Sequence, residues 1–261
     1  MCPPSSVHAK LTRWTRPVVS EGGEQRQLHE SVLDQLGFEI VSGALPAGTR
    51  ISADEVTARF EVSRTVAREV LRVLESLDMV RIRRRAGVTV LDRDKWNSLD
   101  PKLIRWELAG PGRFPQLAWL ADLRSGVEPL AARLAATHAS PAQCGDLTAA
   151  VIGMSATARA ADTAAYLEHD VRFHATLLAA SGNPLLVAFA PIIREVLAGR
   201  TEHALMPHQA DVRALQLHAD VAAAVQVGDG AAAETAMREI VIESATAVAR
   251  LQEQPGTDPN P

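Results

Sequence analysis

Cysteine is almost missing from this sequence, and the two that occur, Cys2 and Cys144, stand far apart along the chain. Two distant cysteines exclude a disulfide framework and a cysteine-rich zinc site, because both need several cysteines at defined spacings. The same scarcity is typical of proteins in a reducing compartment, so we expect a cytoplasmic protein.

Long apolar runs and the commonest enzyme motifs are missing as well. No stretch reaches the roughly 18 apolar residues that a bilayer crossing needs, and the N-terminus shows no apolar signal segment. We therefore expect no membrane partner. The sequence also contains no HExxH, no nucleophile elbow and no GxxxxGKS phosphate loop, which argues against the most familiar hydrolase classes.

Basic residues, by contrast, are concentrated in one segment of an acidic chain. The formal net charge is −4, yet residues 63–85 contain seven arginines and only three acidic residues. The first hundred residues carry 15 basic and 14 acidic side chains, whereas the remainder carries 12 and 17. A local basic patch of this kind is typical of a protein that binds a polyanion.

The pattern around these arginines predicts a winged helix-turn-helix. Apolar residues at helical spacing predict helices over 28–42, 53–60 and 63–77, and Ser63 is the expected N-cap of the third. Residues 80–91 alternate apolar and polar side chains on both sides of an Arg-Arg-Ala-Gly tip, which predicts an antiparallel hairpin.

Three arginines recur every four residues along the third helix, opposite its apolar face. In a helix-turn-helix this helix enters the major groove, where arginine bonds guanine O6 and N7 or binds phosphates. Arg64 and Thr65 stand at the helix start, and we expect Arg64 and Arg68 to contact bases and Arg72 to contact phosphate. A solvated surface stripe is the alternative interpretation, but it leaves the helix-turn-helix order unexplained.

The hairpin tip adds a second cluster of cations. Arg83, Arg84 and Arg85 stand beside Gly87, and together they form a charged wedge. Such a wedge suits the DNA backbone or the narrow minor groove next to the recognition helix.

The rest of the chain predicts helices only, so the expected fold class is mainly α, a winged helix-turn-helix followed by an all-helical bundle. Its helices are expected over 117–138, 141–160, 162–181, 184–203, 209–228 and 230–252. A short helix is also expected over 103–108. The expected domain organisation is a disordered arm (1–23), the winged helix-turn-helix (24–92), a linker (93–116), the bundle (117–252) and a disordered tail (253–261).

Several segments resemble a known family. VSRTVAREVLRVLESLDMV resembles the recognition helix of GntR-family bacterial transcription regulators. HDVRFHATLLAASGNPLL and LHADVAAAVQVGDGAAAETAMREI resemble the effector domain (FCD domain) of the FadR-like branch, and WNSLDPKLIRWELAG resembles its sugar-acid-responsive members, such as galactonate repressors. The resemblance implies a homodimer, most often a repressor, on a pseudo-palindromic operator. It also implies a small organic acid that binds the bundle and changes the affinity for DNA.

The resemblance carries the DNA contacts over to Arg64, Thr65 and Arg68 and to the wing around Arg85 and Gly87. Two departures stand out. Asp54 and Glu55 occupy the place where many members have an arginine, so that DNA contact is expected to be absent. Glu61 stands where the turn often holds glycine, which costs about 1 kcal/mol if the left-handed conformation is kept.

Asp170 and His174 are four residues apart on one expected helix. Their side chains therefore lie one turn apart, where they could bind one metal ion or form a hydrogen-bonded surface pair. The resemblance adds His218 as a third ligand and places the fourth at Ile240, which cannot bind a metal. Two interpretations remain: a three-ligand site for zinc, manganese or nickel completed by water and effector, or a metal-free cavity whose side chains hydrogen-bond the effector. No organic cofactor is expected.

An acidic effector needs a cation to meet its carboxylate. Arg124 matches an arginine of the family's first effector-domain helix, and Arg238 flanks the vacant ligand position at Ile240. Either could instead pair with acidic neighbours at the surface. A metal-dependent hydrolase or lyase built on the Asp/His cluster is the alternative function, but the cluster includes no evident general base besides the ligands. We therefore expect a regulator that is not an enzyme.

Overall fold

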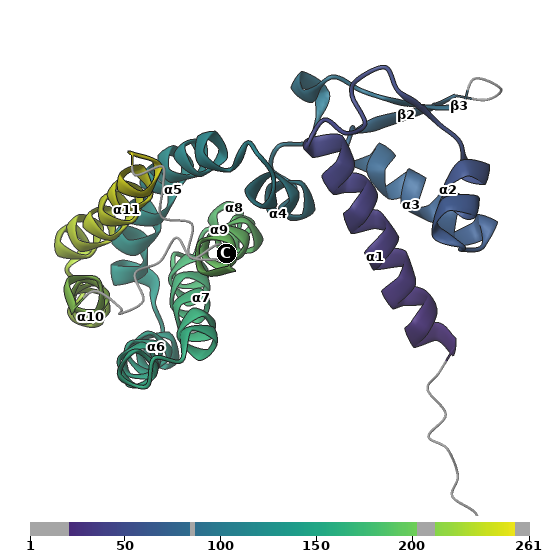
Figure 1. Cartoon of the computed structure of the whole chain (residues 1–261). Helices are drawn as coiled ribbons and strands as arrows, with labels where there is room; N and C mark the ends of the chain where they lie inside the picture. The colour runs from purple at the N-terminus through teal and green to yellow at the C-terminus, as the bar shows by residue number, and fades with distance from the viewer. Residues whose placement is uncertain (1–20, 84–86, 203–211, 254–261) are drawn as a thin grey trace, which may run out of the picture.

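The secondary structure changes along the chain from a small mixed unit to a helical bundle. A computed structural model describes residues 21–83, 87–202 and 212–253 (Figure 1). The N-terminal unit contains α1 (Glu21–Val41), β1 (Arg50–Ile51), α2 (Ala53–Phe60), α3 (Arg64–Ser76), β2 (Val80–Arg83) and β3 (Gly87–Val90). This order confirms the predicted winged helix-turn-helix. The arm expected over 1–23 and the tail expected over 253–261 lie mostly outside the described residues.

Serine caps determine where α2 and α3 begin. The Ser52 hydroxyl accepts a hydrogen bond from the Glu55 amide (3.1 Å), and the Glu55 carboxylate accepts one from the Ser52 amide (2.7 Å). Ser63 accepts a hydrogen bond from the Val66 amide (3.2 Å), as its predicted capping role requires. Glu61 ends α2 at φ 53°, so this chain does keep the left-handed conformation with a residue less suited to it than glycine.

The sheet has three antiparallel strands in the order β1-β3-β2. Val80 pairs with Val90 and Ile82 pairs with Val88, which confirms the predicted hairpin. β1 was not predicted, because two residues are too short to show an alternating pattern. It pairs with β3 and places Ile51 opposite Val88.

The apolar faces of α1 and α3 pack together in the core of this unit. The buried residues that they contribute include Val32, Leu36, Ile40, Val70 and Leu74. Leu28 was expected on the same face but is exposed. Figure 1 shows the reason, since the first turns of α1 extend beyond the elements on which the helix packs.

A packed helix occupies the segment that was expected to be a linker. After the 3₁₀ turn η1 (Arg93–Lys95), α4 (Pro101–Ala109) lies between the N-terminal unit and the bundle and packs on both α1 and α9 (Figure 1). Leu103 and Trp106 belong to the core of the N-terminal unit, whereas Ile104 and Leu108 belong to a core of the bundle. The Trp106 indole also donates a hydrogen bond to Asp34 of α1 (2.9 Å). α4 is therefore a shared structural element of both units.

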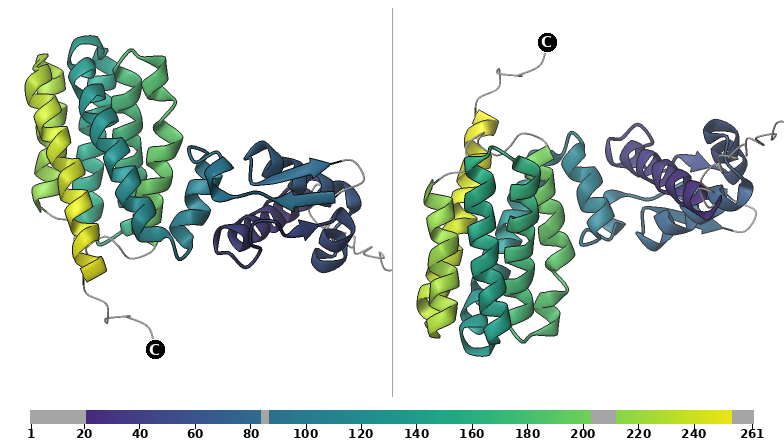
Figure 2. Two further views of the ribbon diagram at one scale, coloured as in Figure 1. Left: turned by 90° about the horizontal axis from the view of Figure 1, so that it is seen from above. Right: turned by 90° about the horizontal axis from the view of Figure 1, so that it is seen from below.

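The bundle helices lie side by side (Figure 2). They are α5 (Arg113–His138), α6 (Pro141–Arg159), α7 (Thr163–Ala180), α8 (Pro184–Val187), α9 (Ala190–Glu202), α10 (Val212–Val227) and α11 (Gly230–Glu253). The single helix expected over 184–203 is two helices, because Pro191 has no amide hydrogen and fits only the first turn of a new helix. None of the helices in the described ranges combines the length and hydropathy that a bilayer crossing requires.

Candidate nucleic-acid interface and buried polar cavity

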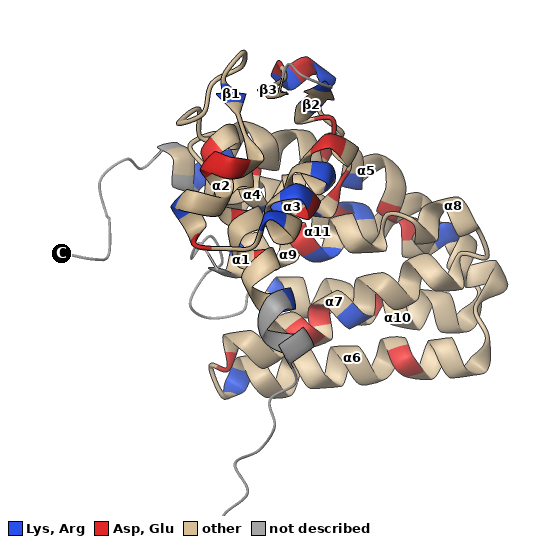
Figure 3. Cartoon of the chain, turned by 90° about the vertical axis from the view of Figure 1, so that its right-hand side faces the viewer, with Lys and Arg blue, Asp and Glu red and all other residues tan. Residues whose placement is uncertain are grey.

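The arginine stripe of α3 lies on the exposed side of that helix. Arg64, Thr65, Arg68 and Arg72 are all exposed, while the opposite side of α3 is buried against the core. Figure 3 shows basic residues along α3, next to acidic residues on α2. Long hydrogen-bond donors along one exposed face are the arrangement that a recognition helix presents to the major groove.

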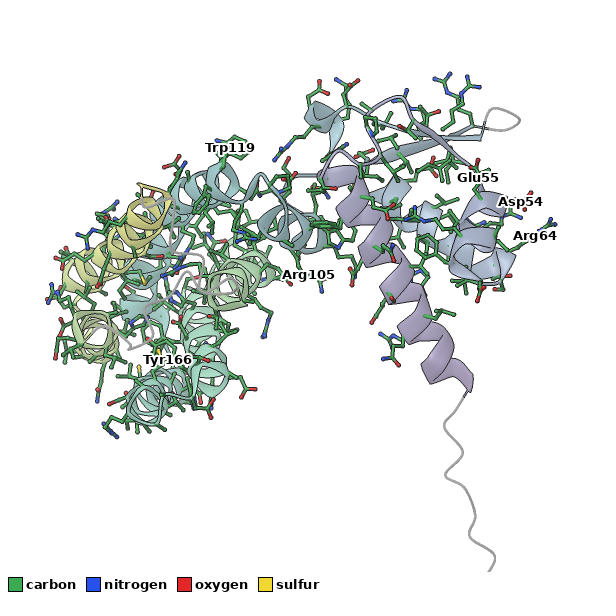
Figure 4. All side chains as sticks on the ribbon, in the orientation of Figure 1. Asp54, Glu55, Arg64, Arg105, Trp119 and Tyr166 are labelled. Carbon is green, nitrogen blue, oxygen red and sulfur yellow. The ribbon has the colours of Figure 1, made fainter. Side chains whose placement is uncertain are left out.

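Two of these arginines already have acidic neighbours. Arg64 Nε lies 3.2 Å from Asp54 Oδ1, and Arg72 Nη1 lies 2.5 Å from Glu69 Oε1. Asp54 and Arg64 both reach outward at the end of the molecule (Figure 4). Their side chains are 75% and 77% exposed, and ion pairs this exposed contribute only about 0.2–1 kcal/mol. Arg64 can therefore leave the carboxylate of Asp54 and bind a base or a phosphate of DNA at little cost in free energy.

The wing is only partly described. Arg83 ends β2 as an exposed residue, and Gly87 begins β3 at φ 82°, a left-handed conformation that favours glycine. Arg84 and Arg85 lie outside the described residues. The predicted contacts of these two arginines with DNA stay predictions.

A cavity of about 510 Å³ lies within the bundle between α5, α7, α9, α10 and α11. It is lined by five buried polar or charged side chains, Arg124, Asp170, His174, Arg200 and His218. Buried polar groups need partners, and several of these atoms have none among the described residues. The cavity therefore offers polar groups that a ligand could satisfy.

Three of these side chains converge on one point. Asp170 Oδ1 lies 3.3 Å from Nε2 of His174, one turn further along α7, and 3.3 Å from Nε2 of His218 on α10. One ligand atom from each residue lies within 4.8 Å of the other two. Neither imidazole Nε2 has a hydrogen-bond partner in the described part of the chain. The structure thus brings together the three residues that were predicted as metal ligands.

The other nitrogen of each imidazole has a partner of its own. His218 Nδ1 donates to the backbone carbonyl of Ala214 (2.7 Å), and His174 Nδ1 contacts the buried carboxylate of Glu128 on α5. Such partners fix the ring orientation and leave Nε2 to a metal ion, as is usual for metal-binding histidines. The three side chains therefore fit a divalent metal.

The charges around His174 are strongly coupled. Burial alone would lower the pKa of His174, but the carboxylates of Glu128 and Asp170 raise it to about 9. Burial alone would raise the pKa of Asp170, but the adjacent imidazoles hold it below its usual range. Without a metal, the histidine proton supplies the positive charge that these carboxylates need.

The fourth ligand position is apolar. Ile240 is buried and lines the cavity without offering a ligand atom. Its neighbour Glu239 is ion-paired to Arg213 and does not join the three ligand residues. Tyr166 also lines the cavity. Burial, and then the charge of Asp170, raise the pKa of its hydroxyl, which stays a neutral donor.

The structure separates the two arginines that were proposed to meet an acidic effector. Arg124 is 2% exposed and lines the cavity, where its Nε donates to Glu128 Oε1 (2.5 Å) and its Nη1 donates to Ser244 (3.3 Å). Arg238 is 48% exposed and ion-paired to Glu234, outside the residues that line the cavity. The expectation that Arg238 reaches the effector is therefore dropped.

Arg200 of α9, and not Arg238, is the second buried arginine that lines the cavity beside Arg124. It is 8% exposed and lines the cavity, and its Nε has no hydrogen-bond partner among the described residues. Sequence reasoning missed it because Arg200 belongs to no motif. A signal was nevertheless present, since Arg200 continues the apolar helical stripe of Ile193, Val196 and Leu197, where a surface arginine would not be placed.

Comparison with known proteins gives two family matches. Residues 28–90 match "Bacterial regulatory proteins, gntR family" and residues 120–243 match the FCD domain. The galactonate operon transcriptional repressor of Escherichia coli K12 is 29% identical over 217 residues, which cover 82% of this chain and 94% of that protein. The gluconate operon transcriptional repressor of Bacillus subtilis 168 is 38% identical over 56 residues, which cover 22% and 23%.

Two solved structures share the fold. Escherichia coli McbR/YncC has a TM-score of 0.52 at 17% identity, covering 87% of this chain and 98% of its own. Lar of Listeria monocytogenes has a TM-score of 0.54 at 18% identity, covering 86% and 97%. These likenesses support the architecture of both units.

Proposed function

The chain is a GntR-family regulator with an N-terminal GntR helix-turn-helix domain and an FCD domain, and from this premise we propose a ligand-responsive repressor. It binds a pseudo-palindromic operator as a homodimer in the cytoplasm. A small carboxylate such as a sugar acid occupies the bundle cavity and changes the affinity for DNA. The galactonate and gluconate repressors among its relatives support the repressor assignment and this ligand class.

One observation carries the proposal. The same chain combines an exposed arginine stripe on α3 with a buried cavity in which Asp170, His174 and His218 face two arginines. α4 contacts the cores of both units. A ligand that moves the helices around the cavity can therefore act through α4 on the N-terminal DNA-binding unit.

We further propose that a divalent metal such as zinc, manganese or nickel binds Asp170, His174 and His218. When bound, the metal supplies Lewis acidity and open coordination positions for oxygen atoms of the effector. Glu128 orients His174, and Arg124 offers a guanidinium to the carboxylate. Ile240 leaves the metal with three protein ligands, so affinity for the metal alone should be lower than in a four-ligand site. A metal-dependent enzyme is not proposed, because GntR-family members are transcription regulators.

A thermal-shift experiment on chelator-treated protein tests this function. Galactonate and gluconate are added with and without zinc, manganese or nickel, and a compound that binds only the folded state raises the melting midpoint. We expect the largest shift when acid and metal are present together. A shift from acid alone would support the metal-free cavity, and no shift from any combination would contradict the effector proposal. The variant His218→Ala should lose the metal-dependent part of the shift.

A further inference from the structure

The two buried arginines of the cavity lie in a wall that it shares with a second cavity. The second cavity is about 260 Å³ and lies between α5, α9 and α11. Arg124, Arg200 and Ser244 line both cavities. The fold therefore brings guanidinium groups from α5 and α9 to the same wall, although the two arginines belong to no common sequence motif.

Neither guanidinium uses all its donors within the described part of the protein. Arg124 Nη2 is buried without a hydrogen-bond partner among the described residues, and so is Arg200 Nε. Arg200 also forms no ion pair with any described residue, whereas Arg124 is paired with Glu128. Burial, and then the charge of Arg124, lower the pKa of Arg200 to about 10. The carboxylates of Asp170 and Glu128 act on Arg200 only at longer range. A buried cation without a direct ion-pair partner is unfavourable, so this site favours a bound anion.

The charged side chains that surround the cavity are equal in number for the two signs among the described residues. Among the described residues, four arginines line the cavity, and four acidic residues line it or lie directly behind it. The arginines are Arg124, Arg200, Arg213 and Arg250, and the acids are Glu128, Asp170, Glu239 and Glu243. These side chains cancel when both histidines are neutral. A divalent metal would then leave two positive charges to be balanced by a ligand.

We propose that the effector carries two anionic groups and that Arg200 is the residue that selects such dianions over acids with one carboxylate. Arg124 and Arg200 each offer a buried donor to one anionic group. Short dicarboxylates, including aldaric acids, have this chemistry, whereas aldonic acids such as galactonate carry a single carboxylate. This inference rests on the proposed function, because it specifies the ligand of the same cavity.

Galactarate and galactonate are a matched pair of probes, because they differ only in the oxidation state of C6. Isothermal titration calorimetry on the full-length, zinc-supplemented protein measures both affinities. We expect galactarate to bind at least tenfold more tightly than galactonate. Arg200→Gln should remove most of this preference by weakening galactarate, with less than a threefold effect on galactonate. Arg238→Gln is the control, because Arg238 is an exposed arginine away from the cavity.

The outcomes separate this inference from the proposed function. Equal or tighter binding of galactonate by the wild-type protein would contradict the dianion inference alone. If Arg200→Gln weakened the binding of both acids to the same extent, with an unchanged melting curve, the selective role of Arg200 would be contradicted. Absence of binding by either acid would contradict the effector function and this inference with it. The wild-type comparison decides the ligand class even if Arg200→Gln fails to fold.

Discussion

At the scale of single residues, the arginines of α3 differ in what they are positioned to contact. Arg64 is the first residue of α3, where side chains of a recognition helix meet base edges, while Arg72 is two turns further along. A bidentate contact with a base contributes roughly 1–3 kcal/mol of discrimination, whereas a phosphate contact is independent of sequence.

We therefore predict that Arg64→Ala weakens operator binding by roughly 1–3 kcal/mol and changes binding to random DNA much less. Arg72→Ala should weaken both alike. The operator is first enriched from a random double-stranded pool, and fluorescence anisotropy then gives the dissociation constants. Equal losses on operator and random DNA for Arg64→Ala would remove its base-reading role.

Asp54 places a carboxylate beside the leading arginine of the interface. The pair is highly exposed, so its contribution to folding is small, but its negative charge faces the same side as Arg64. We predict that Asp54→Asn tightens binding to random DNA several-fold and lowers the ratio of specific to non-specific affinity. Asp146→Asn is the control, because Asp146 forms a similarly exposed pair with Arg172 in the bundle. Weaker DNA binding by Asp54→Asn would show that Asp54 positions Arg64 for contact.

The residues of the cavity were predictable to different degrees. Asp170 and His174 share a helix face, and the family resemblance extended this pair to His218. Glu128 could not be inferred, because its role depends on how α5 and α7 pack. Arg200 shows only that it lies on the apolar face of its helix, and its place in the cavity depends on how α9 packs. The pairing of Arg64 with Asp54 is likewise a property of the folded turn.

At the scale of elements, α4 was predicted as a short helix over 103–108, but its packing on both units was not predicted. Its apolar residues face two different cores, so the sequence shows no single apolar stripe, and the segment 92–116 around it contains the prolines and glycines of a linker. The helices α3, α6 and α7 were predicted closely because each has a clear cap and one long segment. β1 and the break between α8 and α9 were not predicted, because each involves only a few residues and leaves no periodic pattern in the sequence.

Gly37 allows α1 and the Trp106 ring of α4 to approach closely. A Cβ at this position would lie 2.5 Å from that ring, so a larger residue must displace the Trp106 side chain or α4. We predict that Gly37→Ala lowers the free energy of unfolding by about 1–3 kcal/mol, as overpacking does, and weakens the DNA response to the effector. Gly126→Ala on α5 is the control, since nothing lies within 4 Å of its added methyl group. Thermal melts and anisotropy measure the two effects, and an unchanged response in Gly37→Ala would argue against transmission through this contact.

At the scale of the whole molecule, α4 connects the N-terminal DNA-binding unit with the bundle that holds the cavity. In the proposed homodimer, the two N-terminal units must match half-sites about 34 Å apart, so a small change in their spacing alters the affinity for the operator strongly. Trp106 is positioned to transmit such a change, because its indole bonds Asp34 and packs against Gly37 in α1 while α4 also packs on α9. Binding energies couple reciprocally, so DNA must also change the affinity for the effector.

The most direct test is the operator dissociation constant of the full-length protein with and without a saturating sugar acid. Galactonate or galactarate is used, whichever stabilises the folded zinc-supplemented protein more, and His218→Ala is measured beside the wild type. The account predicts a change of at least fivefold in the wild type, within the range of typical allosteric coupling, and little change in His218→Ala. An unchanged operator dissociation constant in the wild type, while the acid still raises its melting midpoint, would contradict the claim that this cavity controls DNA binding.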